Sequence, residues 1–333
     1  MVQAYYNPRS GLGETGQSFE RTSETVRVAA FESPARGLWA RNFSAVTPSG
    51  LGLGEIQGDF DLVPFLKAYP CHEHKSPSKD FLVWLIGFFE AEGCLSLNED
   101  NKNLLFVIRQ KDPQVLYFLR HNLGFGRINH DSDGYYSFQV YKRQHIDLLV
   151  YLLNGNLVLQ KVKKPYRDLL TLERTVSPSI KDAWLSGFTQ GDNGGFNINI
   201  SRRDRTRTGY RVRLRYYLDL KEGFSDLNYI ASHLIGSGRV RPRSGDKMFR
   251  YTMDTHSTIP LLRYYFQKFP LRGQKHIIQV KWFKAYNLVH TKTHLTQYGL
   301  CLIRRIKLSI SELLRATDTE SVQSQSQSQP CQR

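Results

Sequence analysis

A short apolar motif occurs twice in this chain, and its two copies begin 100 residues apart. The first copy spans residues 84–93 (WLIGFFEAEG) and the second spans residues 184–193 (WLSGFTQGDN). Each copy carries small residues four positions apart, and such residues lie on one face of an α-helix. Because small side chains let two helix backbones approach closely, we predict that the two motif helices pack against each other.

Each motif ends in an acid, Glu92 in the first copy and Asp192 in the second. Helices packed side by side would bring these two carboxylates together at one end. Close carboxylates repel each other unless a positive charge lies between them, and a divalent metal ion commonly supplies it. The repeat therefore predicts a catalytic metal site. Glu90 is also acidic, but its counterpart is Gln190, which favours Glu92 as the catalytic acid.

The repeat extends well beyond the two motifs. After each motif the sequence predicts a hairpin, a helix, a Gly-x-Gly turn, a second hairpin and another helix. The turns fall at residues 123–128 and 235–240, and a Gln-Lys pair recurs at residues 160–161 and 274–275. We predict an α+β fold of two pseudo-symmetric αββαββα halves, in which the motif helices pack at the centre and antiparallel sheets form a saddle.

Composition changes sharply at both ends of this repeat. Residues 1–75 are rich in Gly, Ser, Thr and Pro, and we expect a poorly ordered N-terminal extension. Residues 76–176 form the first predicted half and residues 177–316 the second. Residues 317–333 contain a Ser-Gln repeat and are expected to be a disordered tail. Two halves in one chain predict a monomer with pseudo-twofold symmetry.

The charge balance indicates a polyanionic partner. The chain has 46 Lys and Arg residues against 30 Asp and Glu residues, a formal net charge of +16. An excess of this size favours nucleic acid over a membrane surface. No apolar stretch approaches transmembrane length, and the four scattered cysteines favour a reducing compartment.

Alternation in the second half separates an apolar strand face from a polar one. The predicted polar face carries Asn and Arg, the side chains that read adenine and guanine edges in a major groove. Its members are Asn197, Asn199, Ser201 and Arg203 on one strand and Arg211, Arg213 and Arg215 on the next, with Arg205 and Arg207 in the connecting loop and Arg239, Arg241 and Arg243 on the following hairpin. The first half offers fewer candidates, namely Ser96, Asn98, Lys102, Arg109, Arg127 and Lys142.

These paired motifs resemble the LAGLIDADG homing endonucleases, specifically the single-chain form with two motifs. The resemblance covers roughly residues 80–312 and includes both motif helices and both Gly-x-Gly turns. It implies an enzyme that cuts both strands of a long, specific DNA site by hydrolysing one phosphodiester in each strand.

The resemblance also implies roles for individual residues. Glu92 and Asp192 would bind divalent metal together with the main-chain carbonyls of Ala91 and Gly191. Two or more Mg²⁺ ions are expected, with Ca²⁺ supporting binding without cleavage. Lys161 and Lys275 match a family lysine near the scissile phosphate, and Gln110 matches a polar position in the water network. The counterpart of Gln110 is Leu220, so that role would be one-sided, and the extra Asn193 after the second motif alters the pattern there.

Two other functions stay open at this point. An intron RNA maturase uses the same fold to assist splicing, and one chain can do both. A regulator that binds DNA without cutting it would not need the two motif acids, so their presence favours the nuclease. The resemblance further implies residence in a mitochondrion or chloroplast.

Overall fold

The structure is a computed structural model that describes residues 59–70, 75–97, 104–163, 166, 170, 176–191, 194–243 and 247–326. Of residues 97, 161 and 316–326 it describes the backbone alone. All of these residues belong to one compact unit that spans residues 54–333.

The first half contains the predicted αββαββα order. Its elements are α2 (Lys79–Glu92), β1 (Gly93–Leu97), β2 (Leu104–Gln110), α3 (Pro113–Leu123), β3 (Arg127–His130), β4 (Tyr136–Val140) and α4 (Arg143–Leu153), followed by the short α5 (Gln160–Lys163). The strands form an antiparallel sheet in the order β1-β2-β4-β3.

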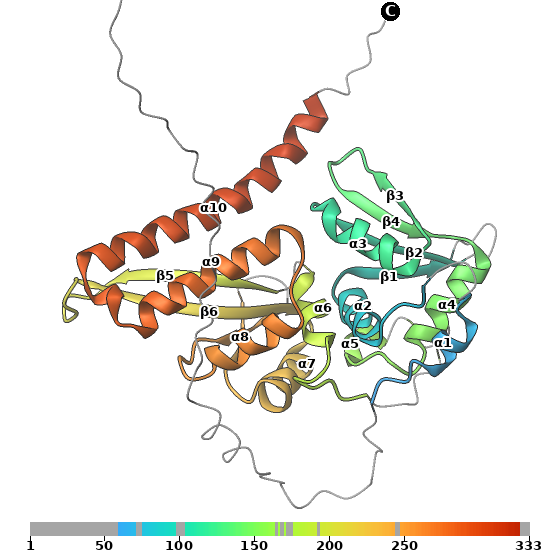
Figure 1. Cartoon of the computed structure of the whole chain (residues 1–333), viewed down its shortest axis with the longest axis horizontal. Helices are drawn as coiled ribbons and strands as arrows, with labels where there is room; N and C mark the ends of the chain where they lie inside the picture. Colours follow the sequence, from blue (N-terminus) through green and yellow to red (C-terminus); the bar gives the residue numbers. More distant parts are fainter. Residues whose placement is uncertain are drawn as a thin grey trace, which may run out of the picture. The chain divides into compact units, whose positions relative to one another are not determined.

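The second half repeats this order and adds helices at its end (Figure 1). Its elements are α6 (Trp184–Gln190), β5 (Gly194–Arg202), β6 (Tyr210–Lys221), α7 (Phe224–Tyr229) with the π-helix η2 (Ile230–Leu234), β7 (Arg239–Pro242), β8 (Met248–Met253), α8 (Ile259–Lys268), α9 (Gly273–His290), the 3₁₀ helix η3 (Thr293–Leu295) and α10 (Gln297–Ser326). The strand order β5-β6-β8-β7 matches that of the first sheet. The predicted α+β fold of two pseudo-symmetric halves is confirmed.

The two Gly-x-Gly turns adopt the same backbone conformation. Gly124 and Gly126 have φ of 73° and 98°, and Gly236 and Gly238 have φ of 70° and 107°. These angles lie in the left-handed region, which glycine enters without steric cost. In the first half this turn follows α3, whose start is capped by Asp112, a carboxylate that accepts a hydrogen bond from Gln114 N at 2.9 Å.

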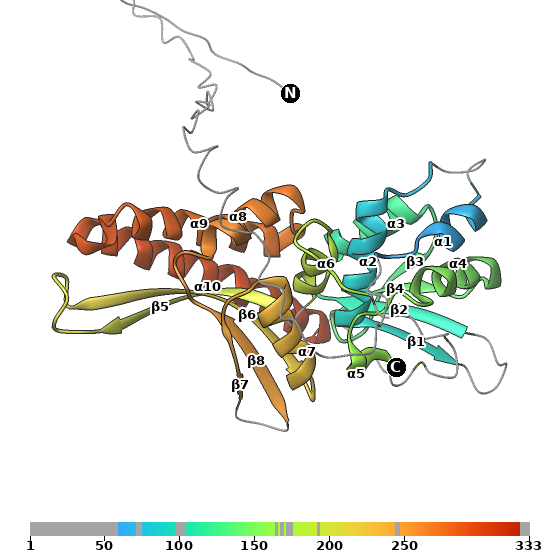
Figure 2. The same ribbon diagram turned by 90° about the horizontal axis from the view of Figure 1, so that it is seen from below.

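Each sheet buries one face beneath helices. In the second half Phe196 and Tyr216 point from β5 and β6 into the core, where Phe196 contacts Trp282 of α9 and Phe266 of α8. Figure 2 shows α8 and α9 on the same side of this sheet. Because side chains alternate along a strand, the opposite face of the sheet is left to the polar residues.

One part of the predicted N-terminal extension is ordered. Helix α1 (Val63–Ala68) lies within residues 1–75, and it buries Phe65 and Tyr69 beside α4. Asn156 also ties this segment down, because its Oδ1 accepts from Asp61 N at 2.7 Å. The prediction of a poorly ordered extension is therefore wrong for residues 59–70, because the helix is too short to show a periodic signal. Residues 1–58 and 71–74 lie outside the described residues.

The predicted boundary of the C-terminal tail falls inside a helix. Helix α10 continues past residue 317 to Ser326, and no glycine or proline interrupts residues 300–329. Residues 327–333 lie outside the described part. Among the described helices, none is both long and apolar enough to span a bilayer.

Candidate active site at the end of the motif helices

The two motif helices contact each other at their glycines. A β-carbon on Gly87 would collide with the carbonyl oxygen of Trp184, and one on Gly187 would collide with the carbonyl oxygen of Trp84. Figure 1 shows α2 and α6 side by side between the two sheets. The small residues of the repeat therefore permit close backbone contact, as predicted from their spacing.

Glu92 lies at the carboxyl end of this helix pair. A β-carbon on Gly191 would stand 2.8 Å from Glu92 Oε1 and 2.5 Å from the β-carbon of Ala91. The carboxylate of the first motif thus packs against Gly191, the residue that follows the second motif helix. Glu92 is partly exposed, whereas Glu90 on the same helix is buried.

Lys275 of α9 points to the same end of α6. Its ammonium donates to the carbonyl oxygen of Thr189 at 3.1 Å and to that of Gly191. The last carbonyls of a helix have no partner within it, and a cation there is stabilised by the helix dipole. The structure therefore brings together three predicted site residues, Glu92, Gly191 and Lys275.

A cavity of about 330 Å³ opens beside Lys275 and draws its walls from both halves. Gln110, the predicted water-network residue, lines it from the end of β2, and its buried Nε2 has no hydrogen-bond partner among the described atoms. Its counterpart Leu220 is buried and apolar. The cavity is also lined by Lys111, Asp112, Tyr135, Gln190, Gly194, Gly195, Phe196, Tyr217, Gln274, Ile278 and Leu314.

Glu90 is occupied by three hydrogen-bond donors. Its Oε1 accepts from the main-chain N–H groups of Val158 and Leu159 at 2.8 and 2.7 Å, and its Oε2 accepts from Trp184 Nε1 at 2.5 Å. Burial raises the pKa of Glu90 to about 7, an effect that these donors only partly offset. Glu90 therefore joins α2 to α6 and to the segment that precedes Lys161.

Gln190 has a related role in the second half. Its Oε1 accepts from Arg272 N at 2.7 Å, which fixes the residue before α9 and hence the start of the helix that carries Lys275. The indole N–H of Trp84, the counterpart of Trp184, is buried without a partner among the described atoms. Glu90 and Gln190 thus fix equivalent segments, each of which leads into a Gln-Lys helix. Of these two residues, Glu90 also joins the two motif helices, through its bond to Trp184.

Two further acids contact the Gln-Lys helices across the halves, and the sequence did not reveal this. Asp112 of the first half accepts from Gln274 N at 2.8 Å, and Asp226 of the second half accepts from Gln160 N at 3.0 Å. Each carboxylate satisfies a main-chain N–H at a helix start. The helix that contains each lysine is consequently positioned by the opposite half. An N-cap pattern marks Asp112 in the sequence, but its second contact depends on tertiary structure.

The predicted basic face of the second sheet exists as a continuous row. Asn197, Asn199 and Ser201 of β5 pair directly with Arg215, Arg213 and Arg211 of β6. Paired residues of an antiparallel sheet project to the same side. Arg203 was predicted on the strand, but β5 ends at Arg202, because Arg203 N donates to Gly209 O at 2.8 Å and closes the turn.

The predicted DNA-binding arginines differ in their partners. Arg109 pairs with Asp131 and Asp133, Arg239 with Asp254, and Arg243 with Asp219, at distances of 2.7–3.1 Å. By contrast, Arg211 has like-charged neighbours, and Arg213 and Arg203 lower the pKa of its guanidinium. The other described candidates with exposed side chains are Ser96, Arg127, Lys142, Arg205, Arg207 and Arg241.

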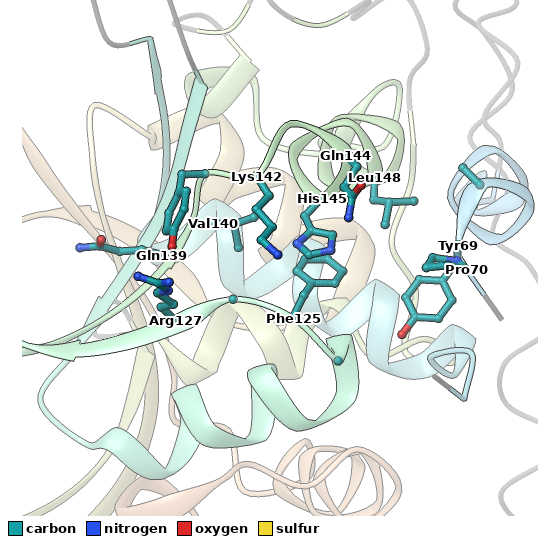
Figure 3. Close-up of a pocket in the computed structure, with 14 residues that line it drawn as sticks. Tyr69, Pro70, Phe125, Arg127, Gln139, Val140, Lys142, Gln144, His145 and Leu148 are labelled. Carbon is teal, nitrogen blue, oxygen red and sulfur yellow. The ribbon is translucent and has the colours of Figure 1, made fainter. Parts of the chain in front are cut away.

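A second cavity, of about 600 Å³, lies at the outer end of the first sheet and is shown in Figure 3. It collects Arg127, Gln139 and Lys142, and His145 stacks on Phe125 with ring centroids 4.3 Å apart. It shares no residue with the cavity around Lys275. Two predicted DNA-binding residues, Arg127 and Lys142, are thus neighbours in space.

Several predicted site residues cannot be placed. Asp192, Asn193, Asn98 and Lys102 lie outside the described residues, and of Lys161 only the backbone is described. Their predicted roles stay predictions. Helix α5, which contains Lys161, follows the segment held by Glu90.

The chemistry of this site fits a divalent cation of the magnesium type. The carboxylate of Glu92 and the carbonyl of Gly191 are oxygen donors, the ligands that Mg²⁺ prefers. Because that carbonyl accepts from Lys275 Nζ, a metal ion bound to it would share the oxygen with the ammonium or displace it. No cluster of three or more His, Cys, Asp or Glu side chains occurs in the part of the chain that the structure describes. A few protein oxygens completed by water and phosphate are typical of Mg²⁺ rather than Zn²⁺ sites.

Comparison with known families agrees with this architecture. The profile of the LAGLIDADG endonuclease family matches residues 85–171 and again residues 185–286. Each match begins inside one motif helix and runs through the sheet of that half. The chain belongs to the LAGLIDADG endonuclease family.

Curated relatives come from fungi. A probable intron-encoded endonuclease 4 of Neurospora crassa is 29% identical over 248 residues, which is 70% of this chain and 44% of the relative. An uncharacterized cox1 intron-2 protein of Schizosaccharomyces pombe is 24% identical, over 70% of this chain and 74% of the relative. The chain thus spans less than half of the Neurospora relative.

Solved structures share the fold. The meganuclease I-AabMI bound to uncleaved DNA is 22% identical with a TM-score of 0.57, and the match covers 68% of this chain and 97% of that one. I-SmaMI bound to an uncleaved DNA target in the presence of calcium ions is 18% identical with a TM-score of 0.52, covering 69% of this chain and 98% of the other.

Proposed function

We propose that this protein is a site-specific DNA endonuclease that uses divalent metal to cut both strands of a long target. The observation that carries the proposal is the convergence of Glu92, Gly191 and Lys275 at one end of the paired motif helices. The row of arginines on β6 supports a nucleic-acid substrate, and I-AabMI and I-SmaMI, which share the fold, were solved bound to DNA.

Glu92 would hold metal together with the carbonyl of Ala91, and Asp192 together with the carbonyl of Gly191. A bound Mg²⁺ would supply Lewis-acid stabilisation of phosphate charge and a more acidic water. Lys275, fixed by Thr189 and Gly191, would place its positive charge beside the phosphate, where negative charge develops as the bond breaks. Lys161 would have the corresponding role for the other strand.

Gln110 would orient solvent in the cavity next to Lys275. Its buried Nε2 has no partner among the described atoms, so it is available to a water molecule or a phosphate oxygen. Because Leu220 stands at the equivalent position, we expect only one of the two strands to be cut with this assistance.

We further propose that the protein is a monomer encoded in an organellar intron. The names of the relatives from Neurospora and Schizosaccharomyces contain the terms intron-encoded or cox1 intron. An intron RNA maturase is the second candidate, since the same origin is compatible with it.

A search for the target tests the proposal. Duplex fragments that tile an intron-free organellar genome of the source organism would be incubated with the protein in Mg²⁺, in Ca²⁺ and in chelator, and new ends would be sequenced. We expect one discrete double-strand cut in Mg²⁺, binding of the same fragment without a cut in Ca²⁺, and no cut in chelator.

Other results would favour the alternatives. Tight, salt-sensitive binding to one fragment with no cut in Mg²⁺ or Mn²⁺ would contradict the nuclease and indicate a regulator. Preferential binding to intron RNA over every duplex fragment would indicate the maturase.

A further inference from the structure

One arginine beside the row of β6 arginines contacts both a carboxylate and an aromatic ring. Arg250 of β8 lies directly opposite Asp219 of β6 in the register of the sheet. Its Nε donates to Asp219 Oδ1 at 2.6 Å and its Nη2 donates to Asp219 Oδ2 at 2.5 Å. The guanidinium carbon also stands 4.2 Å from the ring centroid of Tyr217. A two-point carboxylate contact and an aromatic surface together fix both the position and the plane of the group.

The orientation leaves one edge of this guanidinium available. Asp219 occupies the Nε–Nη2 edge, so the N–H groups of Nη1 and the second N–H of Nη2 point away from it. Asp219 is buried, whereas the Arg250 side chain keeps 32% of its surface exposed. The exposed edge is a planar pair of donors, which matches the O6 and N7 acceptors of guanine in a major groove.

The group lies beside the candidate active site. Tyr217 lines the cavity that contains Lys275, and a β-carbon on Gly195 would stand 2.6 Å from the Tyr217 hydroxyl. Tyr217 and Asp219 follow Arg215 at alternating positions, so they share its face of β6. Arg250 therefore belongs to the basic face, close to the end where the strands leave the motif helices.

The first half contains a similarly held arginine in the equivalent row. Arg109 comes directly after Ile108, which pairs with Gly93 at the start of β1. Asp219 likewise comes directly after Leu218, which pairs with Gly194 at the start of β5. Arg109 is fixed by Asp131 and Asp133, and its guanidinium carbon lies 5.2 Å from the Tyr135 ring centroid. A carboxylate and a tyrosine thus contact one arginine in each half, which lies on β2 in the first half and on β8 in the second.

We propose that Arg250, oriented by Asp219 and Tyr217, is a specificity-determining residue that reads a guanine in the target near the cut. The inference rests on the proposed DNA-binding function. Arg250 shares Asp219 with Arg243, whose Nη1 donates to Asp219 Oδ2 at 2.9 Å, so the carboxylate chiefly fixes the orientation of Arg250, which is what base selection requires. Arg211 on the same face supplies the contrasting case, because Arg213 and Arg203 lower the pKa of its guanidinium and Asp254 opposes them only in part.

The test combines base substitution with protein variants. Once the target is found, each guanine of the second half-site would be replaced in turn by 7-deazaguanine, which lacks the N7 acceptor. Binding in Ca²⁺ would be measured for the natural protein, Arg250→Lys, Asp219→Asn and Arg211→Ala. We expect one guanine whose replacement weakens the natural protein about fivefold or more, and a smaller loss for the Arg250→Lys protein, because a lysine ammonium lacks the planar pair of donors.

The controls separate base reading from charge. Asp219→Asn should reduce the discrimination at the same guanine, and Arg211→Ala should weaken all duplexes equally while keeping it. The dependence of binding on each guanine N7 is measured first with the natural protein, so this result does not depend on how a variant folds.

Three outcomes would overturn the inference. The natural protein could bind its target with no dependence on any N7 in that half-site. The Arg250→Lys protein could retain the full dependence, or lose affinity equally for every duplex. A protein that binds no duplex at all would overturn the proposed function as well, and it is recognised by the absence of binding to the unmodified target.

Discussion

Glu90 and Glu92 lie two residues apart on one helix, and their surroundings give them different roles. Glu92 packs against Gly191 at the exposed end of the helix pair, whereas Glu90 is buried and accepts three hydrogen bonds. A carboxylate already shared among three donors has little capacity left for a metal ion. The acid that ends the motif is therefore the better candidate for catalysis.

The raised pKa of Glu90 predicts a specific pH dependence. The unfolded chain loses this proton near pH 4.5, while the folded chain retains it until about pH 7. The free energy of unfolding should therefore fall as the pH rises from about 4.5 to 7, by on the order of 3 kcal/mol. Denaturant titrations of the natural protein and Glu90→Gln at several pH values measure this contribution.

The Glu90→Gln protein should lose this fall in the free energy of unfolding between about pH 4.5 and 7. It should also be less stable at pH 5 by about 1–3 kcal/mol, because the amide cannot accept from both sides as the carboxyl group does. Glu312→Gln, on the exposed part of α10, is the control and should keep the natural profile. An unchanged pH slope in Glu90→Gln would contradict the assignment.

For individual residues, the sequence identified the motif acids but not the groups that surround them. The repeat singled out Glu92 over Glu90, because only one of them has an acidic counterpart. It could not show that Glu90 meets the N–H groups of Val158 and Leu159, because those partners are 68 and 69 residues away. Likewise Arg250 is recognised only once the register places it opposite Asp219.

The paired motif helices are held at van der Waals contact by their glycines. A methyl group at Gly87 would meet the backbone of α6 rather than a movable side chain. Gly87→Ala should therefore destabilise the protein by about 3 kcal/mol, at the upper end of the usual cost of overpacking. Thermal or denaturant unfolding gives the value directly.

A matched variant lies on the partner helix. Ser186 is also buried in α6, but its hydroxyl has no hydrogen-bond partner among the described atoms. Ser186→Ala should be neutral or slightly stabilising. Equal destabilisation by the two variants would show that the glycine contact is not the limiting feature of this interface.

Helix α10 reaches the candidate active site near its carboxyl end. Gln274 Nε2 donates to Leu313 O at 2.5 Å, and Leu314 lines the cavity that contains Lys275. Removal of residues 309–333 should therefore slow cleavage, by about fivefold for the loss of one hydrogen bond near the lysine. Single-turnover cleavage of the target measures the change.

Gln274→Ala tests whether this bond is the cause. It leaves α10 in place and should reproduce most of the loss, whereas removal of residues 327–333 should have no effect. A truncated protein that cleaves at the natural rate would contradict the role of α10.

Strands with a clear alternation of apolar and polar residues, and a counterpart in the other half, were predicted well. Helices without a counterpart in the other half were not. Residues 196–200 alternate clearly, and β5 and β6 have the expected faces. Helix α1 was missed because its six residues follow a Gly-rich segment and are stabilised by contact with α4. The extent of α10 was underestimated, because Ser-Gln composition resembles disorder although neither residue breaks a helix.

The net charge of +16 acts on the molecule as a whole. Neutralised DNA phosphates release counterions, so the affinity should fall steeply with salt. Replacing Arg211, Arg213 and Arg215 together by alanine should reduce the slope of log affinity against log salt by roughly 2–3. Titrations in Ca²⁺ from low to high salt measure it.

Arginines held by carboxylates should behave differently. Arg250→Lys keeps the charge and should leave the salt slope unchanged. A triple variant with the natural slope would contradict phosphate contacts on this face. The charge and the face were predictable from the sequence, but the division into held and unheld arginines required the acids that the sheet places beside them.

The central claim is that the end of the paired motif helices is the cleavage centre. The most direct measurement is single-turnover cleavage of the target by Glu92→Gln, resolved for each strand, with Glu90→Gln as the neighbouring control. We predict that Glu92→Gln binds the target in Ca²⁺ as tightly as the natural protein but loses cleavage of at least one strand by a hundredfold or more, on the order of 3 kcal/mol. Glu90→Gln alters the segment before Lys161 but leaves Glu92 in place, so it should lose far less cleavage than Glu92→Gln. Cleavage of both strands by Glu92→Gln at the natural rate would contradict the account.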